Sequence, residues 1–119
     1  MTVQELADKG IFSLASEGGE VDRQIQAVFC CDLLSIAMGR APAGCAWVTV
    51  MANMNTLAVA SLADAACVVM AEGAKLDEAA LNKAKLQGIC VMETEEPVFE
   101  AALKIHDYMK NSSAVRQDI

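Results

Sequence analysis

The chain has 119 residues, of which 55% are hydrophobic but only 4% aromatic, and its formal net charge is −7. This length allows one domain with a single hydrophobic core, and so large an apolar share in a small domain predicts self-association into a homodimer. The acidic balance argues against nucleic acid and anionic membrane surfaces as partners, because both carry negative charge.

Targeting and cysteine patterns predict a cytoplasmic protein. The N-terminus lacks the charged and apolar regions of a secretory signal. The apolar stretch 58–71 is interrupted by Asp64 and is too short to span a bilayer. The five cysteines are odd in number and show neither a CxxC nor a Cys/His framework. We therefore expect free thiols and no metal or other cofactor.

The first half of the chain predicts short elements separated by glycine. Thr2 and Glu5 fit a capping box, which starts a helix that ends at Gly10. The elements expected next are a β-prone run over 11–16, a turn at 17–20, a strand over 25–30, a helix capped by Asp32 and closed by Gly39, and a loop at 40–44.

The second half continues the alternation with more strongly apolar strands. The elements expected in order are a strand over 47–51, a helix over 56–63 capped by Asn53 or Asn55, a strand over 66–70, a helix that begins after Asp77 and ends at Gly88, a strand over 89–92, and a final helix opened by Pro97. Such alternation predicts a three-layer α/β/α domain with a largely parallel sheet of about five strands.

Two expectations concern the organisation of this domain. Residues 1–110 should form the domain, and the polar segment 111–119 a peripheral tail. The helix over 56–63 is apolar almost all round, so it needs cover on more than one side. We therefore predict that this helix, or the apolar strands beside it, forms the homodimer interface.

The pattern of strands and turns resembles the DRTGG domain family over roughly residues 6–109. The resemblance is carried by the runs 30–34, 47–50, 68–73 and 88–94. It implies a fold similar to the N-terminal domain of HPr kinase, and a non-catalytic, regulatory domain that accompanies an enzyme partner. At the signature positions this chain has Asn53-Met54-Asn55 and Ala71-Glu72-Gly73, so only Gly73 matches.

A ligand site is expected where the parallel strands end, because open α/β sheets bind ligands at the carboxyl ends of their strands. The residues predicted to line it are Asp32, Asn53, Asn55, Glu72, Gly73 and Thr94. These loops bring several carboxylates and no lysine, which favours a neutral ligand, a cation or a metal-bound nucleotide. The alternative interpretation is that Asp32, Asn53 and Asn55 are helix caps.

No catalytic constellation is visible, so we expect a non-catalytic regulatory or ligand-sensing module. Cys31 is the best placed thiol, since it precedes a helix, and His106 is the only histidine that could activate it. Nothing in the sequence brings the two together. The alternatives are a small thiol- or metal-dependent enzyme and an assembly subunit of a larger enzyme complex.

Overall fold

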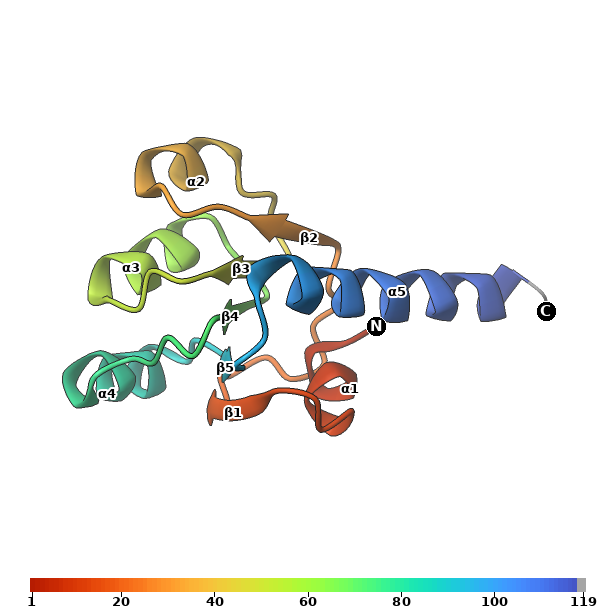
Figure 1. Ribbon diagram of the computed structural model, residues 1–119, viewed down its shortest axis with the longest axis horizontal. Helices are drawn as coiled ribbons and strands as arrows, with labels where there is room; N and C mark the ends of the chain where they lie inside the picture. The colour runs from red at the N-terminus through yellow and green to blue at the C-terminus, as the bar shows by residue number, and fades with distance from the viewer. Residues whose placement is uncertain (118–119) are drawn as a thin grey trace.

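The computed structural model describes the backbone of residues 1–117 and the side chains of residues 1–111. Five strands form one sheet in the order β1-β5-β4-β3-β2 (Figure 1). The strands are β1 (Ser13–Ser16), β2 (Ala27–Cys30), β3 (Cys45–Thr49), β4 (Cys67–Met70) and β5 (Val91–Glu93). The strands β2 to β5 are mutually parallel, and β1 joins β5 in antiparallel orientation. The predicted α/β class and largely parallel sheet are therefore confirmed.

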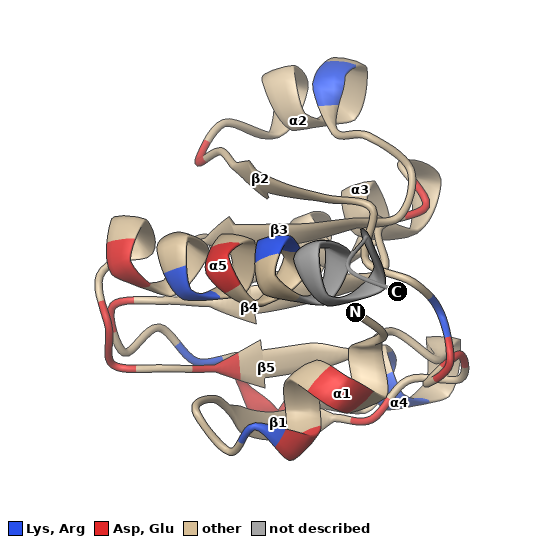
Figure 2. Ribbon diagram, turned by 90° about the vertical axis from the view of Figure 1, so that its right-hand side faces the viewer, with Lys and Arg blue, Asp and Glu red and all other residues tan. Residues whose placement is uncertain are grey.

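Five helices cover this sheet in two layers. They are α1 (Val3–Asp8), α2 (Leu34–Arg40), α3 (Met54–Leu62), α4 (Glu78–Gln87) and α5 (Val98–Gln117). Figures 1 and 2 show α1 and α5 on one face of the sheet and α2, α3 and α4 on the other. Side chains on each strand alternate between the two faces, so each layer has its own apolar cluster. Leu6 and Ile105 belong to the first cluster, and Trp47 and Leu57 to the second.

Four helix ends follow the chemistry expected from the sequence. Thr2 and Glu5 form the capping box of α1. Asn53, rather than Asn55, caps α3, and its side chain accepts a hydrogen bond from the Thr56 amide at 3.1 Å. Asp77 caps α4, which ends at Gly88 in the left-handed conformation. Each cap satisfies backbone groups that a helix end leaves unpaired, so a local signal is enough to set the boundary.

The prediction that Asp32 caps the second helix is wrong. Its carboxylate instead accepts hydrogen bonds from the Thr49 hydroxyl at 2.7 Å and the Val50 amide at 2.9 Å. A cap at Asp32 would start the helix at residue 33, but α2 starts at Leu34. Leu33 therefore occupies the cap position, and no side chain there accepts a hydrogen bond from the helix. Asp32 thus joins the ends of β2 and β3, and its bond to Val50 ends β3 at Thr49 instead of at residue 51.

Smaller differences also arise at other ends. The helix α2 continues past Gly39 to Arg40. Four of the predicted strands begin one or two residues later in the structure, whereas β3 begins two residues earlier than predicted, at Cys45. The helix α5 runs to Gln117, so its backbone passes through most of the predicted tail 111–119. Residues 118–119 and the side chains from 112 onward lie outside the described part, and the expectation of a peripheral tail is not addressed. Within residues 1–117 no helix is both long and apolar enough to cross a membrane.

Candidate functional site

The carboxyl edge of the sheet gathers the residues that the sequence predicts as a ligand site. Because β2 to β5 are parallel, the segments that follow them lie along one edge. Asp32 follows β2, Asn53 and Asn55 follow β3, and Thr94 follows β5. Most of their polar groups are used within the protein: Asp32 links two strands, and Asn53 caps α3. These bonds favour a structural role, and ligand binding at this edge stays a prediction.

Glu72 and Gly73 form a tight turn after β4 that interlocks with the segment after β5. Their amides donate to the carbonyls of Glu96 at 2.8 Å and Thr94 at 3.0 Å. The Glu72 carboxylate accepts from the Val98 amide at 3.2 Å, at the start of α5. Glu72 has φ +60° and Gly73 φ +77°, both in the left-handed region. These contacts anchor the start of α5 to the end of β4.

Little open space remains at this edge. A Cβ added to Gly73 would lie 2.6 Å from a carboxylate oxygen of Glu95, so that side chain already fills the space beside the glycine. A hollow of about 60 Å³ lies next to it, lined in part by Gly73, Thr94 and Lys75. The expectation of an edge without lysine is therefore wrong at Lys75, which follows Gly73 in the same loop. The hollow is large enough for a few water molecules.

The cysteines differ strongly in their surroundings. Cys45, Cys67 and Cys90 are buried, Cys31 is half-buried and Cys30 is exposed; all five are free thiols. Burial raises the pKa of Cys45 and of Cys90 to about 11, and that of Cys67 well above its ordinary value. Although Cys30 is exposed, its thiol is partly desolvated, and this raises its pKa as well. A raised pKa keeps a thiol protonated and weakly nucleophilic at neutral pH.

Cys31 and His106 do not meet. Cys31 packs against the apolar cluster beneath α2, α3 and α4. His106 belongs to α5, on the opposite face of the sheet, and its side chain is 64% exposed. The sheet therefore separates the one histidine from the thiol that it would have to activate.

These surroundings predict two classes of thiol. At pH 8, Ellman's reagent should modify Cys30 and Cys31 in the native protein. The three buried thiols, Cys45, Cys67 and Cys90, should react only after denaturation, because they are inaccessible and burial raises the pKa of each. Five equivalents should be recovered in denaturant. Fewer than five, or rapid native reaction of all five, would contradict this assignment.

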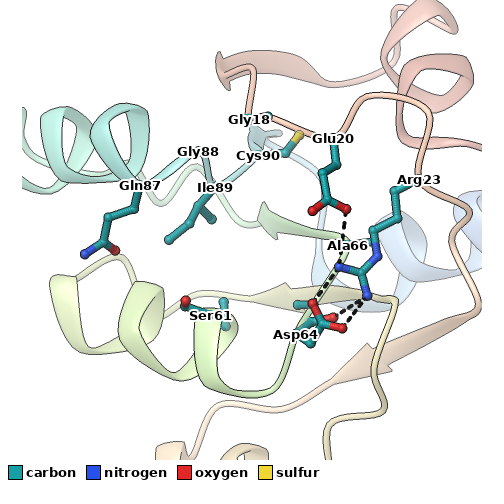
Figure 3. A pocket seen from close by; sticks show the side chains of 13 residues that line it. Gly18, Glu20, Arg23, Ser61, Asp64, Ala66, Gln87, Gly88, Ile89 and Cys90 are labelled. Atoms are coloured by element: carbon teal, nitrogen blue, oxygen red, sulfur yellow. Dashed lines mark hydrogen bonds and ion pairs between the residues drawn. The ribbon is translucent and has the colours of Figure 1, made fainter.

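The larger hollow lies at the opposite, amino edge of the sheet and was not predicted. We call it the amino-edge cavity; its volume is about 160 Å³. It opens between the 18–20 loop, the ends of α3 and α4, and the residues that lead into β4 and β5 (Figure 3). Its lining includes Gly18, Gly19, Glu20, Arg23, Asp64, Ala66, Ile89 and Cys90.

One wall of the amino-edge cavity is an ion pair. The Arg23 guanidinium donates to both carboxylate oxygens of Asp64, at 2.7 and 2.9 Å, and to the Asp64 carbonyl at 2.8 Å. These hydrogen bonds lower the pKa of Asp64 and raise that of Arg23. They also hold Asp64 at φ +61°, a left-handed conformation at the end of α3. The pair is a fixed part of the cavity's rim.

Sequence reasoning missed this cavity because its residues come from three distant segments, 18–23, 60–66 and 87–90. The one signal in the sequence is the glycine in the turns at 18–19 and at 88. Because glycine has no side chain, the backbones of these two turns can approach each other. The Gly19 amide donates to the Gly88 carbonyl at 3.1 Å, so these turns are in contact.

Comparisons with known proteins assign no family. No family model and no curated protein matches the sequence. Within the described residues, no group of three or more His, Cys, Asp or Glu side chains is placed to hold a metal ion.

Proposed function

We propose that this chain is a non-catalytic homodimer with a regulatory, ligand-sensing role. The observation that carries the proposal is an apolar face made by α2 and α3, two helices that lie side by side in the structure (Figure 1) and have one charged residue between them, Arg40. We call it the α2–α3 face. Its exposed apolar side chains are Leu33, Ile36, Met38, Met54 and Leu62.

The charge distribution sets this face apart. From residue 33 to residue 63 the sequence has a single charged residue, Arg40, although charged residues make up 21% of the chain. In Figure 2 the ribbon of α2 carries one basic position, whereas α1 carries acidic positions and α4 and α5 carry both acidic and basic ones. Leu62 is 75% exposed on this face. An exposed apolar cluster without charge is typical of an interaction surface.

A second copy of the chain is the partner that this charge pattern favours. The net charge of −7 means that two copies repel each other over most of their surfaces. The α2–α3 face has no carboxylates between residues 33 and 63, so it can meet its own copy without like-charge contact. Methionine at positions 38 and 54 adds side chains that adapt to a partner. The predicted interface helix, α3, contributes to this face but packs between α2 and α4 in its own layer.

The non-catalytic part of the proposal is supported by the thiols. Four cysteines have a raised pKa, and Cys31 lies across the sheet from His106. The alternative, a thiol- or metal-dependent enzyme, would need a base beside Cys31 or a metal held by the carboxylates at the carboxyl edge of the sheet. The alternative assembly subunit would place another protein, instead of a second copy, on the α2–α3 face.

Three further expectations belong to this proposal. The resemblance to DRTGG domains, with a fold like that of the HPr kinase N-terminal domain, favours a regulatory role beside an enzyme. The cysteine pattern favours the cytoplasm. A small or nucleotide-type ligand at the carboxyl edge of the sheet stays part of the proposal.

Light scattering on the purified chain tests the oligomeric state. We expect a mass of twice 12.6 kDa at micromolar concentration. Interfaces of stable dimers bury roughly 800 Å² on each partner. A mass of 12.6 kDa at all concentrations would contradict the homodimer.

A further inference from the structure

The amino-edge cavity lies where two helices end. Residues 60–61 of α3 and residue 87 of α4 line it, and all are in the last turn of their helices. The carboxyl end of a helix carries partial negative charge from its unpaired carbonyl groups, and cations are favoured there. Two such ends facing one cavity give it a negative electrostatic potential.

The ionised side chains around the cavity add to that potential. Arg23 is the one cation of the lining, and its guanidinium is bonded to Asp64. Glu20 lies on the same rim with its nearest carboxylate oxygen 4.0 Å from Arg23 and its side chain 77% exposed. The two side chains form an ion pair, but this distance is too long for a hydrogen bond, so the Glu20 carboxylate can still accept one from a ligand. The side chains of the lining therefore sum to one negative charge.

Gly19 belongs to the lining of the cavity. Gly18, its neighbour, has φ +77° and would place a Cβ 2.8 Å from the Cys90 amide nitrogen, so both conformation and packing require glycine there. Gly19 is outside the left-handed region, and a Cβ added to it would meet no atom within 4 Å. Neither reason for glycine applies to Gly19, so a side chain can be placed at this position of the lining without backbone strain or a clash at Cβ.

We propose that the amino-edge cavity binds a small organic cation, with an amine or guanidinium group at Glu20 and the ends of α3 and α4, and a short apolar part on the floor of the cavity. That floor is formed by Ala66, Ile89 and Cys90, which lead into β4 and β5. This inference deepens the proposed function, since it gives the sensing module a class of ligand. A volume of about 160 Å³ suits a molecule of this size.

The test is an NMR titration with four probes that share a short unbranched alkyl chain and differ in the head group. Butylammonium and butylguanidinium should shift the amide resonances of Gly18, Gly19 and Gly88 saturably, at constant ionic strength. Butyrate and butanol should leave them unchanged. The comparison isolates charge sign, because size and apolar area are nearly the same.

Three variants locate the binding. Gly19→Leu should weaken cation binding about tenfold or more, because its side chain fills the mouth of the cavity. Glu20→Gln should weaken it several-fold while keeping the shape. Asn82→Leu adds a leucine at an exposed position of α4 outside the lining and should bind like the parent. The amide spectrum of Gly19→Leu shows whether this variant folds. If it does not fold, cation binding by Glu20→Gln is compared with that by the parent instead.

Several outcomes overturn the proposal. Equal binding of butyrate, no saturable shift with either cation, or shifts confined to Asn53, Asn55 and Thr94 would each exclude a cation site at the amino edge. Light scattering on the same samples separates this failure from that of the homodimer, since the cavity and the α2–α3 face can be tested independently.

Discussion

Placing a carboxylate on each helix of the α2–α3 face should convert the homodimer into monomers. In the double variant Ile36→Glu/Leu62→Glu, a two-fold interface would have to bury four carboxylates without partners. An unpaired charge at an interface costs several kcal/mol, so we expect the dimer dissociation constant to rise by a factor of about 100 or more. Sedimentation velocity over a concentration series measures this directly.

The matched control is Phe99→Glu on α5. Phe99 is 69% exposed and belongs to the helix on the opposite face of the sheet, so the same kind of substitution should leave the dimer intact. Dissociation by Phe99→Glu, with no effect of the double variant, would move the interface to α5. An unchanged dissociation constant in both variants would exclude the α2–α3 face.

Removing the indole of Trp47 should cause the largest loss of stability of any single substitution considered for this chain. Trp47 has no exposed surface, lies in the central region of β3, and its indole nitrogen donates to the Cys31 carbonyl at 3.0 Å. We expect Trp47→Ala to lower the free energy of unfolding by about 3 to 5 kcal/mol, through the cavity that it leaves and the lost bond. Urea unfolding followed by circular dichroism is suitable, since Trp47 is the only tryptophan.

The comparison needs a fixed protein concentration, because the unfolding of a dimer depends on it. Leu86→Ala is the control: Leu86 is 88% exposed on α4, and we expect a change within about 0.5 kcal/mol. Trp47→Phe should fall between the two, since it keeps most of the volume and loses the hydrogen bond. A loss below about 1 kcal/mol in Trp47→Ala would show that the second apolar cluster tolerates the cavity.

Much of the fold is predictable because its signals are local. The caps at Thr2 and Asp77 and the left-handed Gly88 each act over three or four residues, so the sequence alone locates those helix ends. For α3 the sequence leaves the cap open between Asn53 and Asn55, and the structure has Asn53. The apolar runs likewise locate the buried strands, and their alternation with helices gives a mostly parallel sheet.

The incorrect predictions share a cause: the position of each residue depends on elements that are distant in the sequence. Asp32 has the sequence of a helix cap but bonds to Thr49, 17 residues away, because the ends of β2 and β3 meet. Cys30 lies in an apolar run, yet β2 is an edge strand and leaves it exposed.

The candidate site shows the same limit. The general rule for open sheets favours the carboxyl edge, and the parallel strands do bring the predicted residues there. Whether that edge has room for a ligand depends on side chains such as Glu95, which packs beside Gly73. The amino-edge cavity depends on Arg23 meeting Asp64 across 41 residues, a contact that no local pattern indicates.

Native mass spectrometry of the protein purified from its own source tests the account most directly, because it reports subunit number and retained small molecules together. We expect a homodimer of two 12.6 kDa chains that carries a small cationic molecule, released on mild activation and absent from Gly19→Leu. A bare monomer, or a complex in which the chain is bound only to a different protein, would contradict a ligand-sensing homodimer.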